Sequence, residues 1–278
     1  MLKGILSTLY LFVNCGIIRL ILLVYYIMSS TLLGIRIDNF SVAEALEKAG
    51  SFVSSGGQHL IFTPNPEMLV KTKDDNYFNE VLNRGAMNLC DGFGIQLFTK
   101  IRRIPGVDFM IELCALAEQK KYSIYLLGSG SDEVVSKTRE NLLDKFPDLK
   151  IVGFDKGPTI YENFQFPISN FQSNNNDQFP IKKINDAKPD ILFVAFGMGK
   201  QEKWLAENLS KMPSVKIGMG VGGAFDYISG HTTRAPRLMR KIGLEWLYRV
   251  WKQPKRFSRI FNATIKFSYL VLRQNYVD

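Results

Sequence analysis

The sequence of 278 residues contains few histidines and cysteines, which many metal sites and catalytic triads require. Its two histidines, His59 and His231, nearly exclude a histidine-based metal site or a Ser-His-Asp triad by number alone. The three cysteines, Cys15, Cys90 and Cys114, are an odd number without metal-ligand spacing. They fit a protein of the reducing cytoplasm with buried or inert thiols.

A signal-peptide cleavage site is also missing. The apolar run Ile5–Met28 is long enough for a membrane-spanning helix of about 20 residues, but no small-residue cleavage motif follows it. Asn14 and Arg19 interrupt the run, and an arginine at the centre of a spanning helix costs about 2.5–3.5 kcal/mol. Two interpretations stay open. Residues 1–28 are a membrane anchor, or translation starts at Met28 and the upstream run is not part of the protein.

Acidic residues are scarce towards the C-terminal end. The net charge is +9, and the only acid between Arg234 and Arg273 is Glu245. Aromatic residues alternate with the basic ones there, as expected at a lipid headgroup interface, where each basic group contributes about 1 kcal/mol. We expect residues 231–278 to form a basic, aromatic appendage that associates with an anionic membrane surface. The alternative is an ordinary helix whose aromatic side packs on the preceding domain.

Between residues 29 and 230, short apolar segments alternate with segments of helical periodicity. The predicted strands are His59–Thr63, Met87–Cys90, Ser123–Leu127, Lys150–Gly153, Ile191–Phe196 and Val215–Gly220. The predicted helices are Ser41–Ser54, Glu67–Asn83, Gly106–Lys120, Asp132–Lys145 and Gln201–Leu209. The segment 163–178 is predicted to be a variable loop or the surface of a short helix. The alternation favours an α/β domain with a Rossmann-like, mainly parallel sheet flanked by helices. Ligands of such sheets bind beyond the carboxyl ends of the strands.

Glycine-rich turns follow three of the predicted strands. They are Gly128-Ser129-Gly130, the segment from Gly197 to Glu202, and the segment from Gly220 to Asp226. Glycine lets backbone N–H groups approach a phosphate at a helix N-terminus, and Lys200 and Gln201 add side chains that bind a diphosphate. The third glycine and the acidic ribose ligand of the dinucleotide fingerprint are missing, which weighs against a nucleotide-dependent oxidoreductase.

Two other strand ends carry side chains suited to catalysis. Asp91 follows a predicted strand and precedes a glycine, a common way to present a general base, although an aspartate that caps the next helix has the same pattern. In Thr63-Pro64-Asn65-Pro66 the prolines restrict the backbone, so that Thr63 and Asn65 are presented rigidly. The alternative for this segment is an ordinary helix entry.

The chain resembles the WecG/TagA/CpsF glycosyltransferases in the order of its motifs from about Leu32 to Arg259. The motifs are T-x-N-P-E, D-G-x-G, R-x-P-G-x-D, L-x-G, G-x-G-K-Q-E-x-W, G-V-G-G-A-F-D and R-A-P-x-x-x-R-x-x-G-L-E-W-L-Y-R. The resemblance implies inverting transfer of an N-acetylmannosamine-type sugar from UDP to undecaprenyl-diphosphate-linked N-acetylglucosamine, in surface polysaccharide synthesis. It implies no essential metal and no cofactor, and no D-x-D motif follows an apolar strand. The leaving UDP then needs cationic and N–H donors.

The resemblance also implies roles for individual residues. Asp91 matches the general base, Thr63 and Asn65 match contacts to the acceptor or the donor sugar, and Arg103 matches an active-site arginine. The segment between Asp91 and Arg103 is shorter than is usual in the family. The candidate donor and diphosphate contacts, from the turns and from the basic end, are Gly128, Gly130, Gly197, Lys200, Gln201, Glu202, Gly222, Asp226, Arg234, Arg237 and Arg249.

The expected partners are a UDP-sugar donor, a polyprenyl-diphosphate-linked acceptor and an anionic membrane surface. A nucleic acid is not expected, because it would leave the glycine turns unexplained, and a homo-oligomer stays open. The expected location is the cytoplasmic face of the bacterial inner membrane, with the protein either peripheral or anchored by its N-terminal run. The rival from another class is a non-catalytic protein that binds a nucleotide sugar or a lipid diphosphate; such a protein has no need of Asp91.

Overall fold

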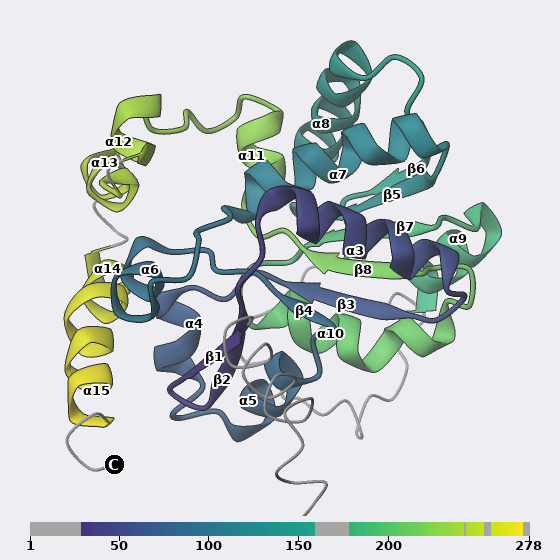
Figure 1. Cartoon of the computed structure of the whole chain (residues 1–278). Helices are drawn as coiled ribbons and strands as arrows, with labels where there is room; N and C mark the ends of the chain where they lie inside the picture. Colours follow the sequence, from purple (N-terminus) through teal and green to yellow (C-terminus); the bar gives the residue numbers. More distant parts are fainter. Residues whose placement is uncertain (1–28, 159–177, 242, 253–256, 275–278) are drawn as a thin grey trace, which may run out of the picture.

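The computed structural model describes residues 29–158, 178–241, 243–252 and 257–274 (Figure 1). Its centre is a six-stranded parallel sheet in the order β4-β3-β8-β7-β5-β6. The strands are β3 (His59–Phe62), β4 (Met87–Asn88), β5 (Ser123–Gly128), β6 (Lys150–Asp155), β7 (Ile191–Ala195) and β8 (Ile217–Gly220). An antiparallel pair, β1 (Ser29–Leu32) and β2 (Ile35–Asp38), precedes it. The predicted α/β class and all six predicted strands are confirmed.

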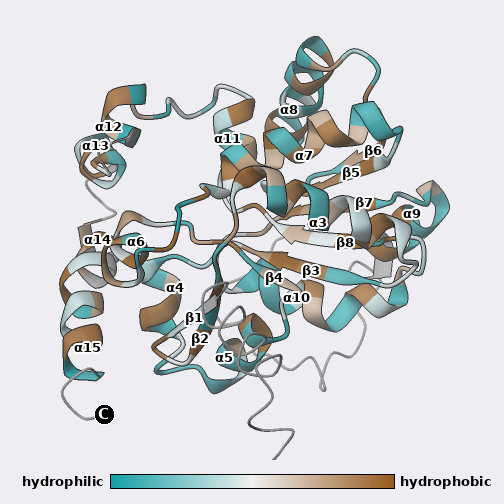
Figure 2. Ribbon diagram, viewed as in Figure 1, coloured by the Kyte–Doolittle hydropathy of each residue, from teal (hydrophilic) through white to brown (hydrophobic). Residues whose placement is uncertain are grey.

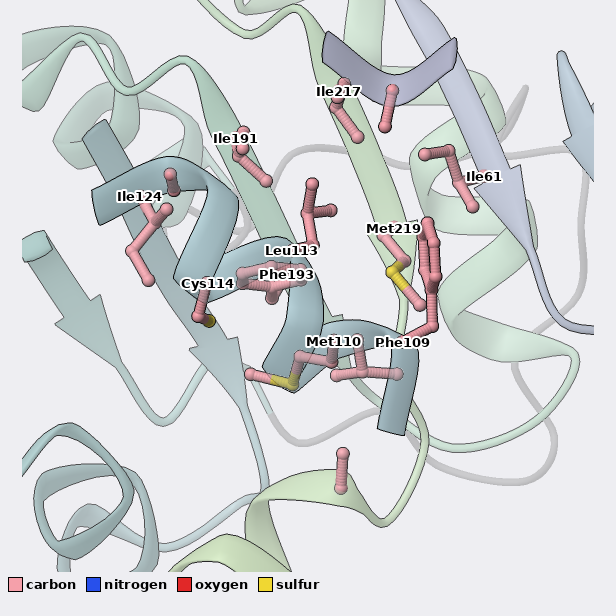
Figure 3. Packing of buried hydrophobic residues seen from close by; sticks show 14 of the residues in the cluster. Ile61, Phe109, Met110, Leu113, Cys114, Ile124, Ile191, Phe193, Ile217 and Met219 are labelled. Carbon is pink, nitrogen blue, oxygen red and sulfur yellow. The ribbon is translucent and has the colours of Figure 1, made fainter. Parts of the chain in front are cut away.

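Helices cover both faces of the sheet. One face carries α3 (Val42–Ser54), α7 (Gly106–Lys120), α8 (Asp132–Lys145) and α11 (Ala224–Ile228). The other carries α4 (Pro66–Lys71), α5 (Asn76–Asn83), α9 (Gln178–Ala187) and α10 (Lys200–Asn208). Alternate strand residues serve the two sides, because side chains along a strand point to opposite faces. In Figure 3, Phe109 of α7 lies beside Met219 of β8, and Leu113 of α7 lies next to Phe193 of β7.

Local capping explains where the helices begin and corrects one prediction. Ser41 caps α3 and Glu44 completes the predicted capping box. The single helix predicted from Glu67 to Asn83 is wrong: the chain breaks after α4, and α5 starts anew at Asn76. The side chain of Asp75 accepts a hydrogen bond from the backbone N–H of Phe78 at 2.9 Å, which makes Asp75 the N-cap of α5.

The C-terminal segment is helical and packs beside α4 and α6 (Phe93–Thr99) (Figure 1). It comprises α12 (Arg237–Lys241), α13 (Glu245–Lys252), α14 (Phe257–Phe261), a π-helical turn (Asn262–Lys266) and α15 (Phe267–Gln274). Phe267 and Val271 are each 1% exposed and belong to the same core cluster as α4. None of the described helices is long and apolar enough to cross a membrane. The N-terminal run and residues 163–177 of the predicted loop lie outside the described part, and Gln178, the last residue of that prediction, is the first residue of α9.

Strands β5 and β7 approach each other closely at Gly128, and a substitution there tests this contact. It has φ +121°, and a Cβ there would lie 2.7 Å from the carbonyl carbon and oxygen of Ala195. We expect Gly128→Ala to lower the free energy of unfolding by about 1–3 kcal/mol through overpacking, in addition to backbone strain, as measured by urea unfolding. Gly56→Ala is the matched control, because Gly56 also has positive φ but no atom lies within 4 Å of the place that its Cβ would occupy. Equal losses in the two variants would contradict the close approach.

Candidate active site

A polar cavity of about 530 Å³, cavity 1, lies at the carboxyl ends of β3, β5, β7 and β8, where the sheet rule places a ligand. Its wall is formed by the loops that follow these strands and by Asp91, which follows β4. Nine of the predicted site residues line it: Thr63, Asn65, Asp91, Gly130, Gly197, Gln201, Glu202, Gly222 and Asp226. The topology therefore brings together motifs that are spread over most of the chain.

A second cavity of about 330 Å³, cavity 2, lies between α6 and the C-terminal segment. Asn65, Glu67 and Asp91 line both cavities, so the two meet there. Apart from these shared residues, the wall of cavity 2 is mostly apolar, with Arg103 and Glu245 as its charged members. Its apolar members include Phe93, Leu97, Phe98, Trp246, Ile260 and Phe267.

Asp91 is at the junction of the cavities and is not a helix cap. Its backbone N–H donates to the carbonyl oxygen of Pro64 at 2.9 Å, which ties the loop after β4 to the loop after β3. The helix that follows, α6, has Gly92 at its N-cap and no side-chain capping bond. Asp91 thus lines both cavities, a position that suits a general base, and the capping alternative does not describe this residue.

Cys90, the residue before Asp91, is not a nucleophile. Its side chain is buried. Burial first, and the negative charge of Asp91 second, raise the pKa of the Cys90 thiol to about 12. Because the thiolate is the reactive form of cysteine, this thiol is inert near neutral pH.

Thr63 and Asn65 reach the cavity from the loop after β3. Asn65 is the N-cap of α4: its Oδ1 accepts a hydrogen bond from the backbone N–H of Met68 at 3.0 Å. The helix-entry interpretation is thus correct for Asn65, which also lines both cavities. Thr63 lies against the start of α7, where its Oγ1 is 2.9 Å from the place that a Cβ of Gly106 would occupy. Glycine at position 106 lets α7 begin directly beside Thr63.

A chain of three hydrogen bonds joins the loops after β7 and β8. The backbone N–H of Gly199 donates to Glu202 Oε2 at 2.7 Å, and Gln201 Nε2 donates to Glu202 Oε1 at 2.8 Å. Gln201 Oε1 in turn accepts from the backbone N–H of Gly222 at 2.9 Å. Gln201 and Glu202 are almost fully buried. Their polar atoms therefore hold the two glycine loops at a fixed separation in the floor of cavity 1.

Arg234 is held by carboxylates of the catalytic domain and the C-terminal segment. Its guanidinium makes a bidentate pair with Asp108 at 2.5 and 3.0 Å, and its Nε lies 3.8 Å from Glu245 Oε1. Burial lowers the pKa of Arg234, but Asp108, then Glu245 and Asp91, outweigh it and raise the pKa. Arg234 therefore stays charged within electrostatic range of Asp91.

The same network ties α12 to the loop before α7. Arg240 Nη1 lies 3.8 Å from Asp108 Oδ1, and Arg103 Nη2 donates to the carbonyl oxygen of Arg240 at 3.0 Å. Arg103, which lines cavity 2, is thus joined to the C-terminal segment by its own hydrogen bond. Sequence reasoning missed Asp108 and Glu245 as partners of the arginines, although both lie inside quoted motifs. Each is an isolated acidic residue among basic or glycine-rich neighbours, and this was the signal that could have identified them as partners of the arginines.

Five predicted contacts do not line either cavity among the described residues, and one of them is Arg234, which is engaged by Asp108. Gly128 packs against Ala195 of β7, and the next two residues, Ser129 and Gly130, line cavity 1 instead. Lys200 is half-buried at the start of α10, and Arg237 is exposed at the start of α12. Arg249 lies in α13, but its side chain is outside the described part of the structure.

The fold and the site define an α/β protein with a polar ligand cleft at the carboxyl ends of a parallel sheet, adjoined by an apolar cavity. The chain belongs to the WecG/TagA/CpsF family of glycosyl transferases, whose family model matches residues 30–277. The resemblance found in the motifs is confirmed by this match, and with it the glycosyltransferase class.

Similar proteins occur in Staphylococcus aureus. The proteins of strains MW2, NCTC 8325 / PS 47 and COL are each 27% identical to this chain over 250 residues, which cover 87% of this chain and 91% of the relative. Each carries the name N-acetylglucosaminyldiphosphoundecaprenol N-acetyl-beta-D-mannosaminyltransferase. Among the described residues, no group of three or more His, Cys, Asp or Glu side chains is placed to hold a metal ion.

Glu202 gives a pH-dependent test of the hydrogen-bond chain. Burial, which outweighs the bonds from Gln201 and Gly199, raises the pKa of Glu202 above its ordinary value, so the folded protein holds this proton more tightly than the unfolded chain. The stability that protonated Glu202 contributes is therefore fully present below the pKa of a glutamate in the unfolded chain, about 4.3. It is lost as the pH rises through the pKa of Glu202 in the folded protein. In Glu202→Gln, an amide NH2 group replaces one of the two oxygens that accept from the backbone N–H of Gly199 and from Gln201 Nε2. Two hydrogen-bond donors would then face each other, and one hydrogen bond would be lost.

We expect Glu202→Gln to be less stable by about 1–3 kcal/mol at the acid end of this window, with the gap narrowing as pH rises. Urea unfolding from about pH 5 to about pH 8 measures the gap. Glu47→Gln on the exposed surface of α3 is the control. A gap that stays constant or widens with pH would contradict the raised pKa.

Proposed function

We propose that this protein transfers an N-acetylmannosamine-type sugar from UDP to N-acetylglucosamine linked to undecaprenyl diphosphate, in the synthesis of a bacterial surface polysaccharide. The observation that carries the proposal is the meeting of two cavities of different polarity at Asp91. A reaction between a nucleotide sugar and a lipid-linked sugar needs two such sites and a base between them. The names of the staphylococcal relatives support the acceptor and the sugar.

Cavity 1 is the proposed donor site. The loops at Gly130, Gly197 and Gly222 offer backbone N–H groups and close approach to a diphosphate, as glycine-rich turns do in other phosphate sites. Asp226 and Thr232, which also line this cavity, add side chains that bind hydroxyl or N–H groups of a nucleoside. Gln201 and Glu202 act by fixing the two loops, so their effect on the donor is through the position of Gly222 and Gly199.

The proposed reaction is a single displacement. Asp91 accepts the proton of the acceptor hydroxyl while the hydroxyl oxygen attacks the anomeric carbon of the donor sugar. The bond from that carbon to the oxygen of UDP breaks on the opposite side, so the configuration inverts. Thr63 and Asn65 border the reacting atoms, and no metal is required. The charge on the leaving UDP is stabilised by backbone N–H groups and by cations, for which Lys200, Arg234, Arg237 and Arg249 are proposed.

Asp91→Asn tests the base. We expect this variant to lose about 10²- to 10⁴-fold in turnover with UDP-N-acetylmannosamine and a short-chain prenyl-diphosphate N-acetylglucosamine, measured with EDTA present. Binding of UDP, measured by calorimetry, should stay unchanged because the amide keeps the shape of the side chain. Asp144→Asn, on the exposed surface of α8, is the control. Full turnover in Asp91→Asn would remove Asp91 from the role of base, and failure of the unmodified protein to bind UDP would overturn the donor assignment.

Peripheral attachment to the cytoplasmic face of the membrane completes the proposal. Large apolar side chains are exposed over α12–α15, and Figure 2 shows hydrophobic residues along α15. They are Leu238, Trp246, Leu247, Trp251, Phe257, Phe261, Ile265, Tyr269 and Leu272. Exposed apolar groups interleaved with basic ones favour an anionic lipid surface, and such a surface would bring cavity 2 to the level of a lipid-linked acceptor.

A double substitution tests this surface. Trp251→Ser with Phe257→Ser removes two of the most exposed aromatic groups. We expect the affinity for vesicles of phosphatidylglycerol to fall at least about tenfold in a sedimentation assay, because burying each side chain is worth about 1.5–3 kcal/mol. Val152→Ser with Phe154→Ser, on the exposed edge strand β6, is the matched control. An equal loss in both double variants, or in neither, would contradict attachment through the C-terminal segment.

A further inference from the structure

Cavity 2 is polar at one end and apolar at the other. The residues that it shares with cavity 1, Asn65, Glu67 and Asp91, mark its inner end. Phe93, Leu97 and Trp246 line the same cavity and are 41%, 64% and 40% exposed, so they mark its mouth. One end of a ligand that fills cavity 2 would therefore contact carboxylate and amide groups, and its other end would lie between apolar side chains at the mouth.

The two walls at the apolar end come from different parts of the chain and are held together by close packing. The rings of Phe98 in α6 and Phe267 in α15 meet edge to face, with 5.7 Å between their centroids. Gly243 approaches the ring of Phe93 so closely that a Cβ would lie 2.4 Å from it. The apolar end is therefore a built cleft with defined walls, and its lining continues onto an exposed surface.

The helix that forms one wall is apolar on two sides. Phe267 and Val271 face inward and are buried, whereas Ile265, Tyr269 and Leu272 are about half exposed. A helix with this pattern is stable when its outer side also meets an apolar medium. The exposed outer side of α15 does not line cavity 2, whereas Phe267, on its inner side, does.

We propose that cavity 2 binds the first isoprenoid units of the acceptor, next to its diphosphate, between Leu97 of α6 and Trp246 of α13. The inference rests on the proposed function, since it takes the acceptor sugar to be at Asp91. It adds that the lipid chain is itself recognised by the enzyme and is more than an anchor in the bilayer. Arg103, on the same wall, is placed to pair with the diphosphate between sugar and chain.

Two acceptors with the same N-acetylglucosamine diphosphate head test this inference in vesicle-free solution, one with a farnesyl chain and one with a propyl chain. We expect the unmodified protein to have a higher kcat/KM for the farnesyl acceptor. Leu97→Ser should lower the ratio of the two kcat/KM values about tenfold, since burial of one leucine side chain is worth about 1.5–3 kcal/mol. Trp246→Ala is a second variant with the same expected effect.

Leu272→Ser is the matched control, because Leu272 is about as exposed as Leu97 but lies outside cavity 2, on the outer side of α15. It should leave the ratio unchanged. Equal kcat/KM values for the two acceptors in the unmodified protein would overturn the inference and leave the proposed function intact. A ratio lowered equally in Leu97→Ser and Leu272→Ser would overturn it as well, by showing general adhesion of the chain. Absence of transfer to either acceptor would instead count against the proposed function.

Discussion

The parallel pairing of β3, β8, β7 and β5 is the constraint on which the site depends. Parallel strands end at the same edge of a sheet, and helices on both faces keep these strands buried and in register. Loops that are more than a hundred residues apart in the chain, at Thr63 and Val221 for instance, are thereby brought to one cavity.

The two cavities are built by different means. Cavity 1 consists of glycine loops whose separation is set by the buried side chains of Gln201 and Glu202, so its shape depends on hydrogen bonds within the core. Cavity 2 consists of side chains from α6 and from the C-terminal segment, and its shape depends on aromatic packing and on the pairing of Arg234 with Asp108. Asp91 thus lies where cavity 1, which is held by buried hydrogen bonds, meets cavity 2, which is formed partly by the C-terminal helices.

The C-terminal segment has to serve two surfaces at once. Phe267 and Val271 bury themselves against α4 and contribute to the core, while Trp251, Phe257 and Tyr269 stay exposed. The packing alternative for the basic, aromatic end is therefore correct for Phe267 and Val271, whereas its association with a membrane stays a proposal. The arginines divide likewise, since Arg234 is engaged by carboxylates and Arg237 is exposed.

The sequence by itself determined the six strands of the main sheet, four of the five predicted helices and the list of polar residues at the strand ends, because apolar periodicity and glycine turns are local signals. The elements β1, β2, α6 and α9 were not predicted. The sequence pattern also misjudged the break between α4 and α5, where the side chain of Asp75 caps a new helix after the polar run 71–75. Only the tertiary structure decided that Glu202 is buried, that Asp108 engages Arg234, and that Asp91 stands between two cavities. These facts depend on which distant segments meet, and that is set by sheet order and packing, which no local pattern records.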